Sequence, residues 1–260
     1  VMVGSWEYED YAKNFDGGLG WVSAGSGRID LTGKPLGEAL YTRVALEKDN
    51  GPYIAVCPVN HTGDRHSPSA WKMTNAMPSW SWTGCEGQKA SIEVYARAAR
   101  VELWLNGRIV GRKALKNDCL AKFSAPYEPG RLEAVSYDAQ GCELGRCTLT
   151  TAGQQTQITA GPEQSSVQAG HLCYIRLRYT DEKGITKPLA RGNIKVEVDG
   201  GTLVGLGNAC PYHERSYLDC VADTYYGEAL AIVRAGEENS LTLTADDGMY
   251  STAVTVPVTH

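Results

Sequence analysis

The sequence predicts a mainly β protein: two antiparallel β-sandwiches, preceded by a short strand-loop-helix segment from a (β/α)8 barrel. Three observations predict this fold class. Apolar and polar residues alternate through many short runs, as they do in half-buried strands. Turn-forming residues separate these runs at regular intervals after Pro52, which is typical of a sandwich. Only the segment from Leu36 to Val44 has apolar residues at helical spacing.

The clearest strand signal lies between Ser91 and Gly111. Apolar residues occupy alternate positions in two runs: Ile92, Val94, and then Val101, Leu103, Leu105. The residues between them, such as Glu93 and Tyr95, fall on the other face of half-buried strands. Asn106-Gly107 follows directly, and this dipeptide tolerates the positive φ angles of a type I′ hairpin turn. We therefore expect a hairpin in the middle of the first sandwich.

The first fifty residues have a different pattern. Val1–Trp6 predicts a short buried strand, and the glycine-rich stretch 15–27 predicts a loop. A turn at 30–35 precedes a helix that Pro35 opens, with Leu36, Leu40 and Val44 on one face, and Asn50-Gly51 ends it. Strand, loop and helix make one unit of an α/β barrel, which cannot bury its apolar faces alone. We therefore expect a fragment of a longer protein.

Domain boundaries follow from these patterns. We predict a barrel segment at 1–50, a first sandwich at 51–153 and a second at 165–258. The stretch 153–168 is rich in Gln, Gly, Ser and Thr and is the predicted linker. In the second sandwich, Cys173, Ile175, Leu177 and Tyr179 alternate with polar residues.

Composition excludes several classes of function. A formal charge of −5 gives no basic surface for nucleic acid or an anionic membrane. No apolar run approaches the roughly 20 residues of a membrane-spanning helix, and the first residues lack a signal-peptide pattern. The eight cysteines are scattered without a Cys-x-x-Cys pair. We expect reduced thiols and a bacterial cytoplasmic protein, with disulfides and a secreted or periplasmic protein as the alternative.

Carboxylates and aromatic residues crowd the end of the first strand: Trp6, Glu7, Tyr8, Glu9, Asp10 and Tyr11. Barrel enzymes place their sites at the carboxyl ends of strands, and such residues suit sugar chemistry. Glycoside hydrolysis needs two carboxylates across the bond, usually from different strands. This stretch can therefore supply one wall of a site at most, with Trp6 as the residue that stacks on sugar.

Other candidate sites have simpler structural explanations. Cys210, His213 and Cys220 could hold zinc, but no fourth ligand stands at the usual spacing. His61 and His66 lie in a polar loop, and the glycines of 201–208 miss the nucleotide-binding spacing. Trp80 and Trp82 alternate with serines, so a strand there would place both rings on one face. We expect packed rings; exposed rings would instead form a carbohydrate platform.

Three motifs, in order, resemble the C-terminal part of bacterial β-galactosidase-like enzymes of glycoside hydrolase family 2. "VGSWEYEDY" with "GRIDLTGKPLGEALYTR" resembles the last barrel strand and the entry to the last barrel helix, although Lys34 precedes Pro35 here rather than following it. "WSWTGCEGQKASIEVYARAARVELWLNGRIVGRK" resembles the Ig-like module that follows the barrel. "GTLVGLGNACPYHERSY" and "GEALAIVRAG" resemble a final Ig-like module.

The resemblance implies the C-terminal accessory region of a retaining β-galactosidase, made of two Ig-like sandwiches. The family's catalytic glutamates match no residue here, so it implies no catalytic residue, cofactor or metal in this chain. It places Trp6 in the sugar subsite, with Asp10 and Tyr11 beside it, and implies three partners: the carbohydrate substrate, the barrel and a second copy of the chain. The alternative is a free-standing carbohydrate-binding or adhesive Ig-like array, which an exposed Trp80–Trp82 face would favour.

Overall fold

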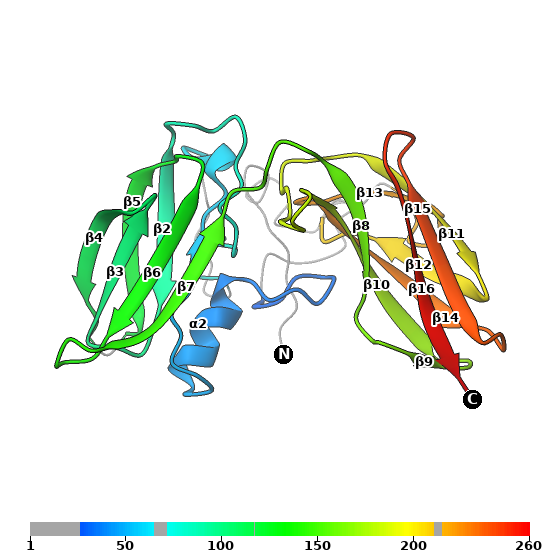
Figure 1. The fold of residues 1–260 in the computed structure, drawn as a ribbon, viewed down its shortest axis with the longest axis horizontal. Coiled ribbons are helices and arrows are strands. Elements are labelled where there is room, and N and C mark those ends of the chain that lie inside the picture. The colour runs from blue at the N-terminus through cyan, green and yellow to red at the C-terminus, as the bar shows by residue number, and fades with distance from the viewer. Residues whose placement is uncertain (1–26, 65–71, 117, 211–214) are drawn as a thin grey trace, which may run out of the picture. The chain divides into compact units, whose positions relative to one another are not determined.

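The computed structural model describes residues 27–64, 72–116, 118–210 and 215–260. Antiparallel sheets dominate, as the sequence predicts, and the chain divides after Thr151 into two compact units. Figure 1 shows the sheets of each unit stacked face to face. Within the described residues no helix is long and apolar enough to cross a membrane. The predicted site residues Trp6, Asp10 and Tyr11 lie outside the described residues.

Unit 1 begins with helix α2 (Gly37–Ala45), followed by β1 (Tyr53–Val56), a 3-10 turn η1 (Val59–His61) and β2 (Lys89–Tyr95). The next strands are β3 (Arg100–Leu105), β4 (Arg108–Ala114), β5 (Leu120–Pro126), β6 (Arg131–Tyr137) and β7 (Glu143–Thr150). One sheet has the order β1-β2-β5 and the other β4-β3-β6-β7. The chain therefore crosses from one sheet to the other between β2 and β3. The apolar faces of the two sheets meet in the core.

The predicted hairpin turn is confirmed. β3 and β4 pair antiparallel across Asn106-Gly107, where φ is +50° and +78°. The side chain of Asn106 also binds the neighbouring turn, since its Nδ2 donates to the Pro129 carbonyl at 3.0 Å and its Oδ1 accepts the Arg131 N–H at 2.8 Å. The hairpin is thus fastened to the start of β6.

Two glycines beside this turn predict different losses of stability. A Cβ on Gly107 meets nothing within 4 Å, so Gly107→Val should lower the free energy of unfolding by about 1–2 kcal/mol through backbone strain alone. A Cβ on Gly130 would lie 2.0 Å from Asn106 Oδ1, so Gly130→Ala should cost more, because Asn106 must release both hydrogen bonds. Urea unfolding of both variants checks the order, and equal losses would contradict the role of Asn106.

The outer face of sheet β1-β2-β5 departs from the sequence prediction. Glu93 and Tyr95, predicted to lie on the unburied face, are only 7% and 1% exposed. Helix α2 covers this face, and Val44 packs there with Ala55 and Tyr95. The helix itself is confirmed, with Val44 buried on its inner side, but it is shorter than predicted. It spans Gly37–Ala45, with the buried Leu36 as its N-cap, and ends before Asn50-Gly51. Alternation in β2 therefore separates two buried faces rather than a core from solvent.

Unit 2 contains β8 (Gln157–Pro162), β9 (Val167–Gln168), β10 (Leu172–Thr180), β11 (Asn193–Asp199) and β12 (Gly201–Gly207). It continues with β13 (Val221–Asp223), β14 (Glu228–Ala235), β15 (Ser240–Asp246) and β16 (Ser251–Thr259). The sheets have the orders β12-β14-β10-β8 and β13-β11-β15-β16-β9. The predicted alternation in β10 is confirmed, because Cys173, Ile175, Leu177 and Tyr179 all lie in the core.

Strand β8 falls inside the segment predicted to be a linker. It pairs with β10 as an edge strand, and edge strands tolerate polar composition because one side faces water. The residues before it are also fixed to unit 2. Lys187 Nζ donates to the carbonyls of Gln154 and Gln155 at 2.9 and 2.7 Å, and the carboxylate of Asp181 accepts the Gly153 N–H at 2.7 Å.

Asp181 predicts a pH-dependent stability. The side chain is 1% exposed and also accepts the N–H groups of Lys183 and Ile185 at 2.9 and 2.8 Å. Burial alone would raise its pKa, but the three N–H donors outweigh burial and lower the pKa below 3.8. The resulting stability is therefore complete above that value and is lost as pH falls through the lowered pKa.

We expect Asp181→Asn to reduce the stability of unit 2 by about 1–3 kcal/mol at pH 7, because a buried carboxylate that accepts backbone N–H groups is lost. The difference from the unsubstituted protein should shrink below about pH 4. Urea unfolding at pH 7 and pH 3 measures both values. Asp199→Asn, at the exposed end of β11, is the control, and we expect a change within about 0.5 kcal/mol. A pH-independent loss at Asp181 would contradict the argument.

Candidate functional site

The tryptophans proposed as a carbohydrate platform are buried. Trp80 and Trp82 are 1% and 0% exposed, and the segment that carries them forms no strand. Trp80 Nε1 donates to the Glu128 carbonyl at 3.0 Å, and its ring meets Tyr127 edge-on, with the centroids 4.9 Å apart. The hydroxyl of Thr151 donates to the Trp80 carbonyl at 2.7 Å. The expectation of packed rings is confirmed, and the pair forms part of the core of unit 1.

The other candidates of the sequence gain no support. Among the described residues, no cluster of three His, Cys, Asp or Glu side chains could hold a metal ion. His213 and His66 lie outside the described residues, whereas His61 pairs with Asp64 at 2.6 Å. The glycines of 201–208 belong largely to β12, so they form part of a sheet and not a phosphate-binding loop.

The cysteines are free thiols, as the sequence predicts. Three are buried, three are half-buried and two are exposed: Cys85, Cys119, Cys173; Cys57, Cys147, Cys210; Cys142, Cys220. Cys57, directly after β1, lies beside the sheet face that α2 covers. Burial, followed by the charge of Glu93, raises the pKa of the Cys57 thiol to about 11, so this thiol stays protonated and unreactive at neutral pH.

The junction between helix α2 and sheet β1-β2-β5 contains a buried polar site. Tyr95 Oη donates to Glu93 Oε2 at 2.6 Å, and Lys122 Nζ lies 3.4 Å from the other oxygen of Glu93. Burial, followed by the charge of Glu93 and this hydrogen bond, raises the pKa of Tyr95. The phenol therefore keeps its proton and donates a hydrogen bond to the carboxylate of Glu93.

Glycine allows the helix to approach this pair. A Cβ on Gly37 would lie 2.7 Å from Tyr95 Oη and 2.7 Å from the Ala76 carbonyl, which accepts the Gly37 N–H. One residue later, the buried carboxylate of Glu38 accepts the N–H groups of Met73 and Thr74. The first turn of α2 therefore contacts the sheet at Tyr95 and is hydrogen-bonded to the segment 73–76.

Charged residues hold the other end of the helix. Arg97 Nη2 donates to the Ala45 carbonyl at 3.3 Å, and Nη1 lies 3.2 Å from Glu47. A guanidinium at a helix C-terminus satisfies a free carbonyl and opposes the negative end of the helix dipole. Asp49 joins Arg43 to Tyr53, through its Oδ2 at 3.0 and 2.8 Å. Both ends of α2 are thus fixed to unit 1.

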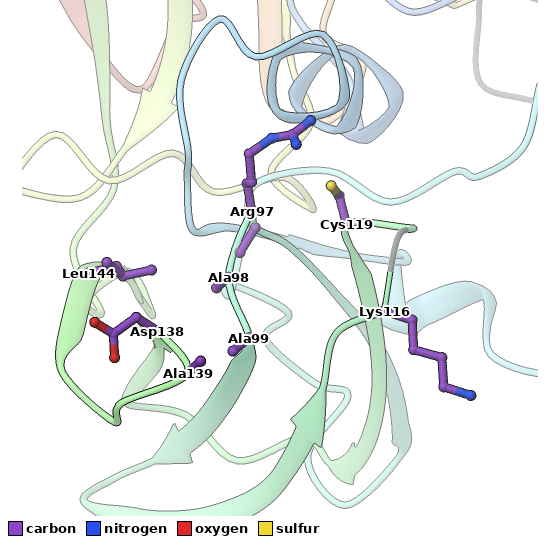
Figure 2. Close-up of a pocket in the computed structure, with 9 residues that line it drawn as sticks. Arg97, Ala98, Ala99, Lys116, Cys119, Asp138, Ala139 and Leu144 are labelled. Carbon is purple, nitrogen blue, oxygen red and sulfur yellow. The ribbon is translucent and has the colours of Figure 1, made fainter.

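A hollow of about 520 Å³ lies at the end of unit 1, among the loops 96–99, 116–119 and 138–144. Five of its nine lining residues are small or apolar: Ala96, Ala98, Ala99, Ala139 and Leu144. Figure 2 shows that Arg97 points toward helix α2 and Lys116 points away from Asp138. The polar groups do not converge on one point and no aromatic ring lines the wall, so the hollow lacks the features of a sugar subsite.

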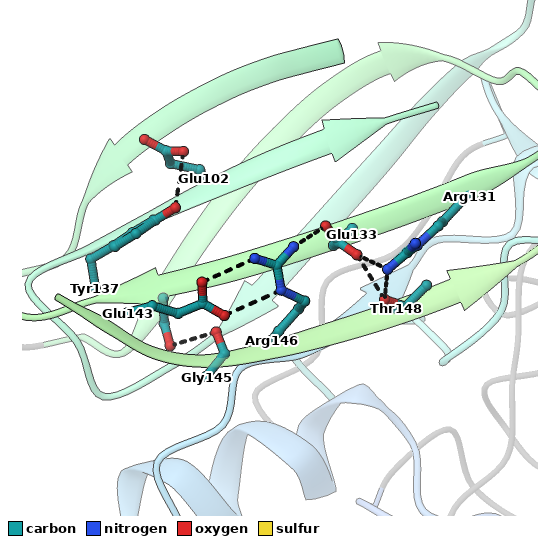
Figure 3. Close-up of polar contacts among 9 residues, drawn as sticks. Glu102, Arg131, Glu133, Tyr137, Glu143, Gly145, Arg146 and Thr148 are labelled. Carbon is teal, nitrogen blue, oxygen red and sulfur yellow. Dashed lines mark hydrogen bonds and ion pairs between the residues drawn. The ribbon is translucent and has the colours of Figure 1, made fainter. Parts of the chain in front are cut away.

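The outward side of sheet β4-β3-β6-β7 carries a network of ion pairs, which sequence reasoning missed. Figure 3 shows Arg146 between the carboxylates of Glu133 and Glu143, with Arg131 on the far side of Glu133. The register places these residues on one face. Glu133 lies opposite Thr148, and Val135, two residues further along β6 and on the same side of it, lies opposite Arg146. Only the strand pairing reveals this arrangement.

Two family models match this chain. Residues 157–255 match the model described as glycoside hydrolase family 2 C-terminal domain 5. Residues 87–145 match a model described as a domain of unknown function, DUF4982. The first match covers nearly all of unit 2 and the second most of the sandwich of unit 1.

Several proteins similar to this chain carry the names of glycoside hydrolases. A Formosa agariphila protein, named provisionally as a beta-glucuronidase, is 33% identical over 90 residues, which are 33% of this chain and 9% of that protein. A glycosyl hydrolase family 2 member from Bacteroides cellulosilyticus is 29% identical, with a TM-score of 0.80 over 90% of this chain and 32% of that one. A beta-glycosidase from Bacteroides vulgatus shares the fold, with a TM-score of 0.74 at 22% identity over 98% of this chain and 30% of that one.

This chain therefore spans about a third of the length of the solved proteins that it resembles. The match in unit 2 is to a C-terminal domain model of glycoside hydrolase family 2. Residues 157–255 therefore resemble a glycoside hydrolase family 2 C-terminal domain, and the fold of the chain is similar to part of a glycoside hydrolase family 2 protein.

Proposed function

We propose that this chain is the accessory C-terminal region of a retaining β-glycosidase, and that the catalytic glutamates lie outside the sequence. The similarity to a family 2 protein over 90% of this chain and only 32% of that one carries this proposal. The tight fixation of helix α2 supports it. A helix held at both ends by a sandwich would tie that sandwich to whatever structure the helix belongs to.

The accessory role that we propose is to hold the last barrel helix and to support the wall of the sugar site beside it. In this proposal Trp6 stacks on the sugar, Asp10 and Tyr11 lie next to it, and the barrel is the principal partner of the chain. The cytoplasm remains our proposed location, in keeping with eight free thiols. Burial of Trp80 and Trp82 removes the feature that would favour a free-standing carbohydrate-binding array.

Two sugars are candidates for the substrate. The sequence motifs resemble β-galactosidase-like enzymes, which favours a β-galactoside. The name of the Formosa agariphila relative, at 33% identity over 90 residues, favours a β-glucuronide. The two differ in configuration at C4 and in the group at C6, where a glucuronide carries a carboxylate that needs a cationic partner.

Hydrolysis of aryl β-galactosides and aryl β-glucuronides tests this function. We expect turnover by a longer protein that joins this chain to its barrel, and none by the 260-residue chain alone. Turnover by the chain alone that survives repurification, and that Glu7→Gln, Glu9→Gln or Asp10→Asn abolishes, would overturn the accessory role. A longer protein that hydrolyses no aryl β-glycoside would overturn the enzymatic assignment.

A further inference from the structure

The outward side of sheet β4-β3-β6-β7 presents more guanidinium groups than carboxylates. We name it the arginine face and define it by Arg100, Glu102, Arg112, Arg131, Glu133, Glu143 and Arg146. Four arginines and three glutamates give a net charge of +1 in a chain of −5. Helix α2 packs on the other sheet of unit 1, so it does not cover this face.

Two of the acids lie beneath the arginines. Glu102 is shared by Arg112 at 2.8 Å and Arg100 at 4.0 Å, and its side chain is 8% exposed. Glu133 is shared in the same way by Arg131 and Arg146, and is 12% exposed. The four guanidinium-bearing side chains are 45–61% exposed, so they meet the solution far more than the two acids beneath them do. Each guanidinium has five N–H donors, and the acids occupy only some of them.

The pairing of Glu143 with Arg146 indicates how an external carboxylate would bind to this face. Arg146 Nε donates to Glu143 Oε1 at 3.2 Å and Nη2 donates to Oε2 at 3.0 Å, which is the bidentate pairing that a planar guanidinium makes with a carboxylate. Unlike Glu102 and Glu133, the Glu143 side chain is 43% exposed (Figure 3). Water therefore reaches this carboxylate, and another carboxylate can replace it at low cost, because an exposed ion pair contributes only about 0–1 kcal/mol.

A protein is a poor partner for such a face. Protein interfaces have an apolar centre that is depleted of charge. Here the exposed large apolar side chains, Ile109 and Leu144, lie on the edge strands β4 and β7. On the central strands β3 and β6, Trp104 and Tyr137 are half-buried between the charged groups, so no exposed apolar centre is present among the described residues. A flexible polymer that carries regularly spaced carboxylates needs no apolar centre, since it exchanges its counterions for arginines.

We propose that the arginine face binds a uronate-bearing polysaccharide, and that a sugar carboxylate displaces Glu143 from Arg146. The choice of a carbohydrate rests on the proposed function, because an accessory region of a glycosidase meets glycans. The choice of a uronate rests on the bidentate geometry. Such a surface would hold an acidic polymer near the enzyme without taking part in hydrolysis.

Binding of the full chain to immobilised polygalacturonate tests the proposal, with immobilised dextran as the neutral polymer. We expect binding to polygalacturonate that weakens steeply between about 20 and 300 mM salt, and none to dextran. Arg112→Gln combined with Arg146→Gln should weaken binding about tenfold. The two buried acids, Glu102 and Glu133, each keep one guanidinium in this variant, so thermal melting should confirm that it folds. Arg43→Gln combined with Lys195→Gln removes the same charge elsewhere and should leave affinity unchanged.

A substitution of opposite sign sharpens the test. Glu143→Gln frees the guanidinium of Arg146 and should tighten binding about threefold, whereas Glu197→Gln, an equal charge change on β11, should not. No binding at low salt, or equal binding by the double arginine variant, would overturn the proposal. Binding to double-stranded DNA or polyglutamate as tight as to polygalacturonate would overturn the assignment to a glycan. None of these results depends on hydrolysis, so a failure here leaves the proposed function standing.

Discussion

Trp80→Ala is expected to lower the free energy of unfolding of unit 1 by about 3–5 kcal/mol, the usual cost of removing a buried tryptophan ring. The ring is 1% exposed, packs edge-on against Tyr127 and donates its N–H to the Glu128 carbonyl. For a domain of this size the midpoint of thermal unfolding should fall by roughly 10–20 °C. Differential scanning calorimetry of the full chain measures this shift.

Two variants separate packing from hydrogen bonding at Trp80. Trp80→Phe keeps a ring against Tyr127 but leaves the Glu128 carbonyl without its donor, so we expect a smaller loss than for Trp80→Ala. Trp104→Phe, on the half-buried outer side of β3, is the control for loss of an indole elsewhere in unit 1. An exposed sugar-binding tryptophan could be removed with a change within about 0.5 kcal/mol, so a neutral Trp80→Ala would contradict the buried position.

Local signals in the sequence predicted those features that local chemistry determines. Asn106-Gly107 specified its turn because few other dipeptides tolerate two positive φ angles. The spacing of Leu36 and Val44 specified the buried side of α2, and the alternation in β10 specified its inward face. Each of these depends on neighbours within a few residues along the chain.

The sequence predictions are wrong where a segment far away in the sequence determines whether a residue is buried. Glu93 and Tyr95 appeared to face outward because the alternation in β2 contains no sign of a covering helix, and that helix lies about fifty residues upstream. The sequence predicts a linker where strand β8 lies, because a polar composition suits a linker and an edge strand equally well. The arginine face was missed because its members come from β3, β4, β6 and β7 and meet only through strand register.

The junction at α2 also bears on the proposed function. A sheet with both faces buried can hold a helix as firmly as it holds its own sandwich core. Gly37, Glu93 and Tyr95 form this junction together. Gly37 has no side chain, which leaves room for the Tyr95 hydroxyl that donates to Glu93. An accessory module of a barrel enzyme needs this kind of attachment.

Tyr95→Ala should therefore loosen helix α2 as well as destabilise unit 1. The side chain is 1% exposed, meets Tyr41 on the helix edge-on at 5.9 Å and donates to Glu93, so we expect a loss of about 3–5 kcal/mol. Amide hydrogen exchange should speed up in Gly37–Ala45 more than in β3 and β6, because the helix loses its aromatic contact with β2.

Tyr95→Phe tests the hydrogen bond separately. It keeps the ring but leaves the Glu93 carboxylate, which is 7% exposed, without the phenol that donates to it, so we expect a loss of about 1–3 kcal/mol. Tyr53→Phe is the matched control, because its hydroxyl donates to Asp49 in a half-buried position and should contribute about 1 kcal/mol or less. If exchange in α2 stays unchanged in Tyr95→Ala, the sheet does not hold the helix, and the attachment that supports the accessory role is lost.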